Sequence, residues 1–291
     1  SMRARRSAPL WATRRRHTNH APESRPMTIP MVSLVTVAHN SASELQHFWR
    51  DWPSDAAEWI VVDNASTDGS AEVARALGAR VIRLDVNIGF SAANNVGAAR
   101  AEGRILGFLN PDLTPTRQGI DALAGRVTTE NAFVAPQLVN IDGTLQENGR
   151  NAPYPLRKLA HMFAPTSRLN HHYVRHVESG LEQVVWVMGA ALFMSREVFE
   201  QVGGWDDQYF IYYEDSDICL RALHLGVPTF VDGDVRWVHG WARQTKTARS
   251  LWVWKQEFRS AIRFYRRHPD CIVPRRSRSG SLGKVEGTAR P

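Results

Sequence analysis

Four short apolar runs, each ended by polar turn residues, constrain the fold of this chain more than any other feature. Helix-forming segments separate these runs along the chain. The runs lie at 32–37, 59–62, 81–84 and 105–109, and the helical segments lie at 43–49, 70–77 and 91–101. Strands that alternate with helices in this way pair in parallel through right-handed crossovers. We therefore predict an α/β fold with a mostly parallel central sheet flanked by helices.

The second half of the chain has a less regular pattern. The elements expected there are a helix over 116–127, a strand over 133–139, a hairpin turn at Asp142-Gly143, a core strand over 184–194, helices over 196–202 and 214–225, and a short strand over 235–238. Residues 149–180 show no clean period, so we expect a long surface segment there. It contains His171, His172 and His176, but no acid or Cys stands at a ligand spacing from them, and we assign no metal site to them.

Most of the positive charge of this 291-residue chain lies near its two ends, although the formal net charge is +7. Residues 1–30 contain seven Arg and one Glu, and residues 274–291 contain four Arg and one Lys with one Glu, so the part between them is slightly acidic. We therefore expect no nucleic-acid partner. The composition predicts disordered basic tails over 1–30 and 269–291 around a single domain over 31–268.

Two further features bear on cellular location. Cys219 and Cys271 are too few for a disulfide framework, which favours the reducing cytoplasm, and the longest strongly apolar run, 184–194, is too short to span a bilayer. Helix 251–267 is amphipathic, with Trp254 and Phe258 on its apolar stripe. It either docks on the sheet or makes a peripheral contact with anionic lipid at the inner face of the plasma membrane, and both alternatives stay open.

Two acidic residues follow strands of the predicted sheet. Asp112 comes just after the fourth run and Pro111, at the carboxyl end where ligands of open α/β sheets bind, although it could instead cap the next helix. Asp63 follows the second run, where a carboxylate can accept from the base or ribose of a nucleotide. The chain has no glycine-rich phosphate loop, so a diphosphate needs another positive group. Mg²⁺ or Mn²⁺ on Asp112 would supply it.

An aromatic and acidic run precedes the expected helix over 214–225. Glu214 and Asp215 stand in its first turn, where the helix dipole favours carboxylates. Four aromatic residues crowd the same place: Tyr209, Phe210, Tyr212 and Tyr213. Their rings either stack on a sugar or pack the floor of a site.

Five segments carry a family resemblance. They are 32–40 (VSLVTVAHN), 61–70 (VVDNASTDGS), 87–97 (NIGFSAANNVG), 109–112 (LNPD) and 203–221 (GGWDDQYFIYYEDSDICLR). In this order they resemble the family 2 glycosyltransferases of the GT-A fold, particularly the bacterial rhamnosyltransferase-like branch, over residues 31–268. The resemblance implies inverting transfer of a sugar from a nucleoside diphosphate sugar, with dTDP-rhamnose the leading donor. The acceptor would be a hydroxyl of a glycan, glycolipid or polyprenyl-linked glycan in cell-envelope polysaccharide synthesis.

The same resemblance implies roles for individual residues. Residues 31–115 would be the nucleotide-sugar half and 116–268 the acceptor-side half. Val37, Ala38, Asn40 and Asp63 would cradle the nucleoside, and Asn87, Gly89 and Asn94 would shape the donor loop. Asn110 stands in place of the first acid of the metal motif, Asp112 would bind the metal, and His239 is a candidate second ligand. Asp215 matches the catalytic base, with Glu214 beside it. A catalytically silent nucleotide-sugar-binding protein in a membrane-associated assembly is the alternative function.

Overall fold

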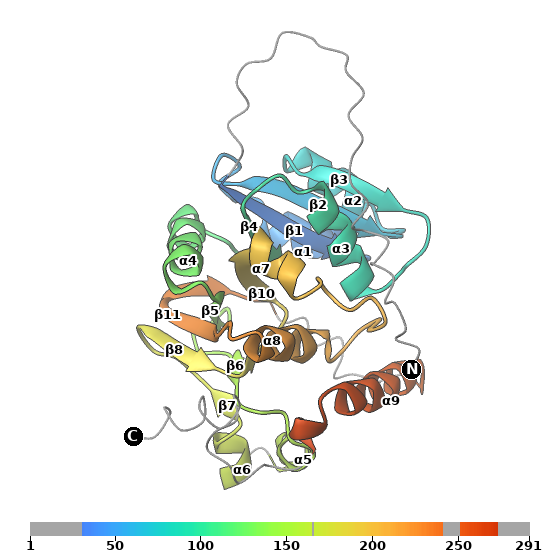
Figure 1. Ribbon diagram of the computed structural model, residues 1–291. Coiled ribbons are helices and arrows are strands. Elements are labelled where there is room, and N and C mark those ends of the chain that lie inside the picture. Colours follow the sequence, from blue (N-terminus) through green and yellow to red (C-terminus); the bar gives the residue numbers. More distant parts are fainter. Residues whose placement is uncertain (1–30, 165, 241–250, 273–291) are drawn as a thin grey trace, which may run out of the picture.

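The computed structural model describes residues 31–164, 166–240 and 251–272. Its centre is an eight-stranded sheet with the strand order β3-β2-β1-β4-β10-β5-β11-β8 (Figure 1). These strands are β1 (Val32–Ala38), β2 (Glu58–Asn64), β3 (Arg80–Leu84), β4 (Ile105–Leu109), β5 (Phe133–Val139), β8 (Leu181–Val184), β10 (Ala191–Ser195) and β11 (Thr229–Val238). Helices flank this sheet, as predicted.

The first four strands pair in parallel, as do β5 and β11 in the other half of the sheet. β1 pairs in parallel with both β2 and β4, and β2 with β3. The connecting helices are α1 (Ala42–Phe48), α2 (Ser70–Ala76), α3 (Phe90–Arg100) and, after β4, α4 (Arg117–Glu130). Leu34 of β1 belongs to the core cluster that contains Trp49, whereas its neighbour Val35 packs in the cluster that contains Ala98. Both faces of β1 are thus covered, which explains why its sequence is a continuous apolar run.

The predicted core strand over 184–194 is wrong, because this run serves two sheets. Its first residue ends β8 and its last residues lie in β10, which is antiparallel to β4 and β5. Between them, β9 (Trp186–Val187) belongs to a separate small sheet. An apolar run shows that residues are buried, but not which partner each residue has. Because β10 runs antiparallel to β4 and β5, the large sheet is mixed.

The expected surface segment over 149–180 is also wrong, because it is built into the fold. β6 (Gly149–Arg150) lies between β7 (Val174–Arg175) and β9 in the small sheet, and α5 (Pro155–Phe163) and α6 (Arg168–His171) complete the segment. Ala152 and Tyr173 are buried. Strands of two residues are too short to show a period, and Pro155 begins α5 instead of breaking it, since proline is favoured in a first helical turn.

The remaining elements follow the predictions more closely. The hairpin turn is present, with the Gly143 amide donating to the Asn140 carbonyl. α7 (Arg196–Gln201), α8 (Glu214–His224) and α9 (Leu251–Arg267) are found where helices were expected. The last strand is longer than the predicted 235–238, because β11 begins at Thr229 and passes through a register shift between Asp232 and Arg236.

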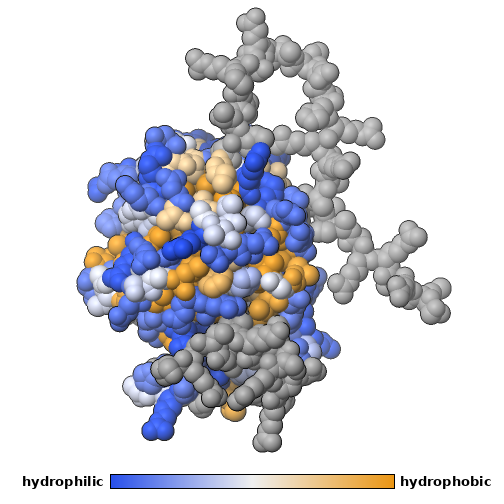
Figure 2. Space-filling view, turned by 60° about the vertical axis from the view of Figure 1, so that its left-hand side comes forward, coloured by the Kyte–Doolittle hydropathy of each residue, from blue (hydrophilic) through white to orange (hydrophobic). Residues whose placement is uncertain are grey.

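The ordered chain continues beyond the predicted boundary at 268. Pro269–Cys271 form the 3₁₀ turn η3, and the Cys271 side chain is buried. The rest of the predicted tails lies outside the described residues. None of the described helices is long and apolar enough to cross a membrane. On the face seen in Figure 2, hydrophobic residues lie in a band between hydrophilic ones.

Candidate active site

The predicted nucleoside cradle lies where β1 and β2 end. Val37 and Ala38 are buried in β1, and Asn40 just after it has a left-handed backbone with φ 52°. The Asn40 side chain accepts from the Thr67 amide at 2.9 Å, which ties the end of β1 to the loop after β2. Asp63 is buried, accepts from the Ser66 amide and lies 3.4 Å from Nε of Arg83. The structure thus brings these predicted residues together at one edge of the sheet.

The predicted donor loop is held by Asn64, a residue that sequence reasoning missed. Its Nδ2 donates to Oδ1 of Asn87 at 2.9 Å and to the Gly89 carbonyl at 3.3 Å, and its Oδ1 accepts from the Ile88 amide at 2.9 Å. The signal available in the sequence was its position directly after Asp63. Gly89 has φ +88°, and a Cβ built there would meet the Phe210 carbonyl oxygen at 2.8 Å. The donor loop therefore packs directly on the aromatic run.

Two asparagines predicted for the donor site, Asn94 and Asn110, donate hydrogen bonds to backbone carbonyls. Asn94 is buried in α3, and its Nδ2 donates to the Phe90 carbonyl one turn earlier. The amide of Asn110 donates to the Ala190 carbonyl at 2.8 Å, which joins the end of β4 to the chain entering β10. The adjacent Gly189 contacts Asp215. Residues 189 and 190 thus connect the end of β4, near Asp112, to the predicted base.

Asp112 and His239, the two predicted metal ligands, lie together. Oδ1 of Asp112 is 3.4 Å from Nε2 of His239, and Nδ1 of His239 is 2.8 Å from Oε1 of Gln146. The other end of that amide, Nε2, donates to the His239 carbonyl. In this amide orientation Nδ1 donates to Gln146, and Nε2 faces Asp112. The capping alternative for Asp112 is wrong, because Thr116 caps α4.

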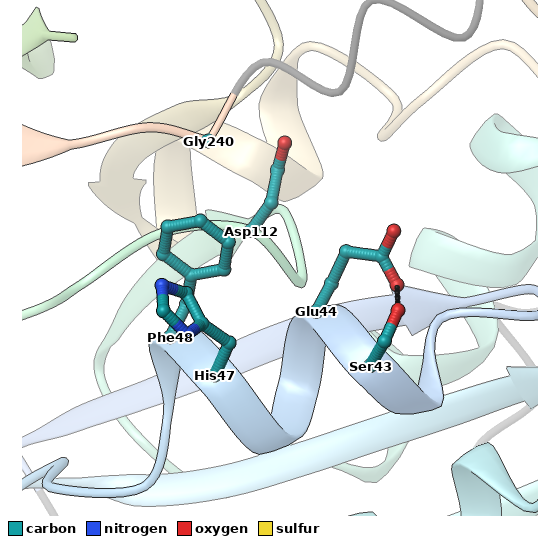
Figure 3. Close-up of a pocket in the computed structure, with 6 residues that line it drawn as sticks. All are labelled: Ser43, Glu44, His47, Phe48, Asp112 and Gly240. Atoms are coloured by element: carbon teal, nitrogen blue, oxygen red, sulfur yellow. Dashed lines mark hydrogen bonds between the residues drawn. The ribbon is translucent and has the colours of Figure 1, made fainter. Parts of the chain in front are cut away.

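This donor pair fits a divalent cation. One carboxylate oxygen and one imidazole nitrogen face each other, and the hydrogen bond from the other imidazole nitrogen to Gln146 orients the ring, as is usual for metal-bound histidine. The described residues contain no group of three or more His, Cys, Asp or Glu that could hold a metal, so a bound ion would need oxygens from a ligand as well. Asp112 also lines a cavity of about 240 Å³ with Phe48 of α1 and Gly240 (Figure 3).

The predicted base lies at the start of α8. Oδ2 of Asp215 accepts from the Gly189 amide at 3.3 Å, and Oδ1 accepts from the Ser216 amide at 2.6 Å. Glu214 is buried, and its Oε2 has no hydrogen-bond partner among the residues that the structure describes. Burial raises the pKa of Asp215, and the ammonium of Lys158 is the largest influence against this rise. Burial and then the neighbouring Asp215 raise the pKa of Glu214 to about 8.

The four aromatic residues differ in what their rings can reach. Tyr209 is fully buried, so for this residue packing replaces the predicted stacking on a sugar. Tyr213 has a positive φ of 70° as the N-cap of α8, and its ring packs against Phe264. Phe210 and Tyr212 are only partly buried, and the Phe210 ring meets Trp252 of α9 edge-on at 5.4 Å. Stacking on a sugar stays a prediction for Phe210, Tyr212 and Tyr213, which is also partly buried.

Comparison with known sequences decides the family. The sequence model of "Glycosyl transferase family 2" matches residues 33–203, more than half of the chain. The chain belongs to glycosyl transferase family 2. A second model, "Glycosyl transferase family group 2", matches residues 150–268. The family predicted from the five segments is confirmed.

Curated relatives of the family include two rhamnosyltransferases. The N-acetylglucosaminyl-diphospho-decaprenol L-rhamnosyltransferase of Mycobacterium tuberculosis (strain ATCC 25618 / H37Rv) is 30% identical over 181 residues, which are 55% of this chain and 58% of that protein. The dTDP-rhamnosyl transferase RfbF of Shigella flexneri is 26% identical over 196 residues, 62% of this chain and 58% of that protein. The match thus spans less than two thirds of the length of either relative.

Solved structures confirm the predicted fold. GalNAc-T7 with UDP, GalNAc and Mn²⁺ has a TM-score of 0.57 at 17% identity, covering 90% of this chain and 55% of that one. The mannosyltransferase PcManGT from Pyrobaculum calidifontis, in complex with GDP-Man and Mn²⁺, has a TM-score of 0.51 at 17% identity, covering 96% and 79%. At these identities the likeness concerns the GT-A fold alone.

Proposed function

We propose that this protein is an inverting glycosyltransferase that moves a sugar from a nucleoside diphosphate sugar to an acceptor hydroxyl. The leading donor is dTDP-rhamnose and the acceptor a glycan, glycolipid or polyprenyl-linked glycan of the cell envelope, because two curated relatives are rhamnosyltransferases. The proposal rests on the position and the backbone contacts of Asp215. This partly buried carboxylate is held by two backbone amides at the start of α8, beside the loops at the end of the sheet.

The proposed step needs one base and one leaving group. Asp215 takes the proton of the acceptor hydroxyl while the acceptor oxygen attacks the anomeric carbon from the face opposite the diphosphate. The new carbon–oxygen bond forms, the bond to the diphosphate breaks, and its electron pair leaves with the diphosphate. The configuration at the anomeric carbon is thereby inverted. The protein's main contribution besides the base is to hold donor and acceptor in line.

The donor would lie along the edge formed by the ends of β1, β2 and β4. Asp63 and the loop held by Asn64 would contact the nucleoside side, and Asp112 with His239 would hold Mg²⁺ or Mn²⁺. When bound, such an ion offsets charge that develops on the leaving diphosphate. Because the two side chains supply one donor atom each, the diphosphate oxygens would complete the coordination.

A peripheral membrane contact through α9 would suit a lipid-linked acceptor. The buried side of this helix holds Ser260, which donates to the Ile211 carbonyl, and Phe264, which packs on Tyr213, so α9 docks on the segment before α8 and not on the sheet as the first sequence alternative expected. Its outer side nevertheless exposes apolar side chains, with Leu251 90%, Phe258 67% and Trp254 46% exposed. Lys255, Arg259 and Arg266 are exposed on the same helix. Apolar and basic side chains together are the composition of helices that lie on anionic lipid.

Calorimetric titration tests the donor part of the proposal. The full chain is titrated with UDP, dTDP, GDP and their common sugars, with and without Mg²⁺ or Mn²⁺. We expect one nucleotide to bind tightly only with metal, and the Asp112→Ala variant to lose that binding while Asp121→Ala, on the exposed side of α4, retains it. Binding that ignores both the metal and Asp112 would contradict the metal site. Binding without any transfer would favour the silent nucleotide-sugar-binding protein.

A further inference from the structure

Lys158, in the segment that sequence reasoning took for a surface loop, lies beside the proposed base. Its Nζ is 3.4 Å from the centroid of the Tyr213 ring, 5.3 Å from that of Trp186 and 5.8 Å from that of Phe264. These three rings, called the aromatic box below, come from three different elements. Tyr213 is the residue just before Glu214 and Asp215. The box therefore holds an ammonium group next to the start of α8.

The aromatic box holds Lys158 without neutralising it. Aromatic faces attract a cation through their quadrupole, and this attraction leaves the charge available to nearby carboxylates. Among the charged groups around Lys158, Asp215 is the one that most favours its ammonium form. Reciprocally, Lys158 is the strongest influence that favours the carboxylate form of Asp215.

Asp215 needs such a partner because of its surroundings. Burial opposes the negative charge of Asp215, and the Asp215 carboxylate in turn raises the pKa of the adjacent Glu214. Other titratable groups interact electrostatically with Lys158 or Asp215, and they come from several elements. They are Arg150 of β6, Tyr173 before β7, Tyr213 and Cys219 of the α8 region, Glu257 of α9 and His161 of α5. Of these, Arg150 adds to the effect of Lys158 on Asp215.

We propose that Lys158, held in the aromatic box, keeps Asp215 in its carboxylate form and is thus a positioning residue for the proposed base. This inference rests on the proposed function. An acceptor proton can move to Asp215 only while Asp215 is ionised. Replacing Lys158 with a neutral residue should therefore move the start of activity to higher pH.

The direction of the shift follows from the two charges. Burial lowers the pKa of Lys158 to about 8, so the ammonium is present throughout the acidic and neutral range. Without it, the pKa of Asp215 rises further. The acid limb of kcat/KM should then move up by about one pH unit or more, the size expected for loss of one nearby opposite charge. Above the new limb the activity should recover.

The experiment compares the full-length wild type with Lys158→Met, Lys158→Gln and Lys158→Arg. The control is Arg157→Met, which removes the neighbouring cation of the same helix, one whose guanidinium lies over Tyr154. The pH profile of kcat/KM is measured for each variant. We expect the acid limb to move in both neutral variants and to stay in Lys158→Arg and Arg157→Met. A uniform loss of activity with an unmoved limb, or a rise in acceptor KM alone, would overturn the proposal.

A second readout separates this inference from the proposed function. The carboxyl resonance of Asp215 in protein labelled with ¹³C at Asp is followed against pH without donor or acceptor, and Asp215→Asn assigns it. We expect its midpoint to rise by about one pH unit or more in the neutral Lys158 variants. An unchanged midpoint would refute the role of Lys158 even in an active enzyme. If the wild type transfers no sugar, the proposed function fails, but this titration still decides what Lys158 does.

Discussion

Nδ1 of His239 donates its proton to Oε1 of Gln146 across 2.8 Å. The contact orients the imidazole, so that Nε2 faces the carboxylate of Asp112. A glutamine on the hairpin after β5 thus sets the tautomer of a histidine at the end of β11. The hydrogen bond between Gln146 and His239 thus holds one of the two candidate metal ligands of the described residues in place.

Gln146→Leu should weaken Mn²⁺ binding by about 10- to 100-fold, because hydrogen bonds that orient a metal-bound histidine commonly contribute that much. The affinity for Mn²⁺ is measured by titrating Mn²⁺ in the presence of the preferred nucleotide and monitoring free Mn²⁺ by electron paramagnetic resonance. Gln201→Leu, which removes an amide that donates to the exposed Glu197 on α7, is the matched control. An affinity for Mn²⁺ that is equal in both variants would show that Gln146 has no such role.

Gly89→Ala should cost about 1–3 kcal/mol of unfolding free energy and weaken donor binding. The backbone φ of +88° strains any residue with a side chain, and the added Cβ would collide with the Phe210 carbonyl. Urea unfolding measures the change. Gly125→Ala in α4 is the control: apart from the adjacent backbone of α4, no atom of the described residues lies within 4 Å of its new Cβ, so it should gain about 0.5–1 kcal/mol. Equal effects of the two changes would contradict the strain at Gly89.

Asp217→Asn should destabilise the protein by about 3 kcal/mol at neutral pH, because it leaves the buried guanidinium of Arg221 without its anion. The Asp217 carboxylate is buried and lies 2.7 Å from Arg221 and 2.8 Å from His268. The hydrogen bond from His268 and the nearby arginines outweigh burial and hold its pKa below the ordinary 3.8.

The pH dependence of unfolding tests the same contact. A carboxyl with a depressed folded pKa stabilises the fold fully above its unfolded value, and this contribution declines as pH falls from about 3.8 toward the folded value. Wild type should therefore lose more stability than Asp217→Asn over that range. Asp121→Asn, at an exposed position of α4, should behave as wild type. Parallel curves for wild type and Asp217→Asn would count against the contact.

Replacing Trp254 and Phe258 together by Ala should reduce binding to vesicles that contain anionic lipid by about tenfold or more, since two large exposed side chains lose their contact with lipid. Vesicle flotation measures the bound fraction. Leu225→Ala removes a side chain that is 56% exposed at the end of α8, and should leave binding unchanged. Flotation that is the same for all three proteins would rule out α9 as a membrane contact.

The sequence was informative where structure is local. Four strands of the sheet could be predicted because each contains a short apolar run, which is buried in β1, β2 and β4, and Asp63 and Asp112 could be placed because they follow two of these runs. The motif around Glu214 and Asp215 pointed to the start of α8 for the same reason.

The parts that could not be predicted depend on contacts between distant segments. The strands β6, β7 and β9 have two residues each, and only their pairing reveals them. Lys158 became a candidate only once α5 had been placed against Tyr213, 55 residues further along the chain. Gln146 reaches His239 across a separation of 93 residues. No periodicity or spacing in the sequence indicates contacts between residues so far apart in the chain.

Sugar transfer by wild type and by Asp215→Asn is the measurement that decides whether Asp215 is the base of an inverting reaction. Each protein is incubated with dTDP-rhamnose or the donor that binds best, Mn²⁺ and a lipid-linked glycan acceptor, and the anomeric configuration of the product is read by NMR. We expect an inverted product from wild type and a loss of about 10²–10⁴-fold in kcat for Asp215→Asn with donor binding intact. A retained configuration, or full activity of Asp215→Asn, would contradict the account.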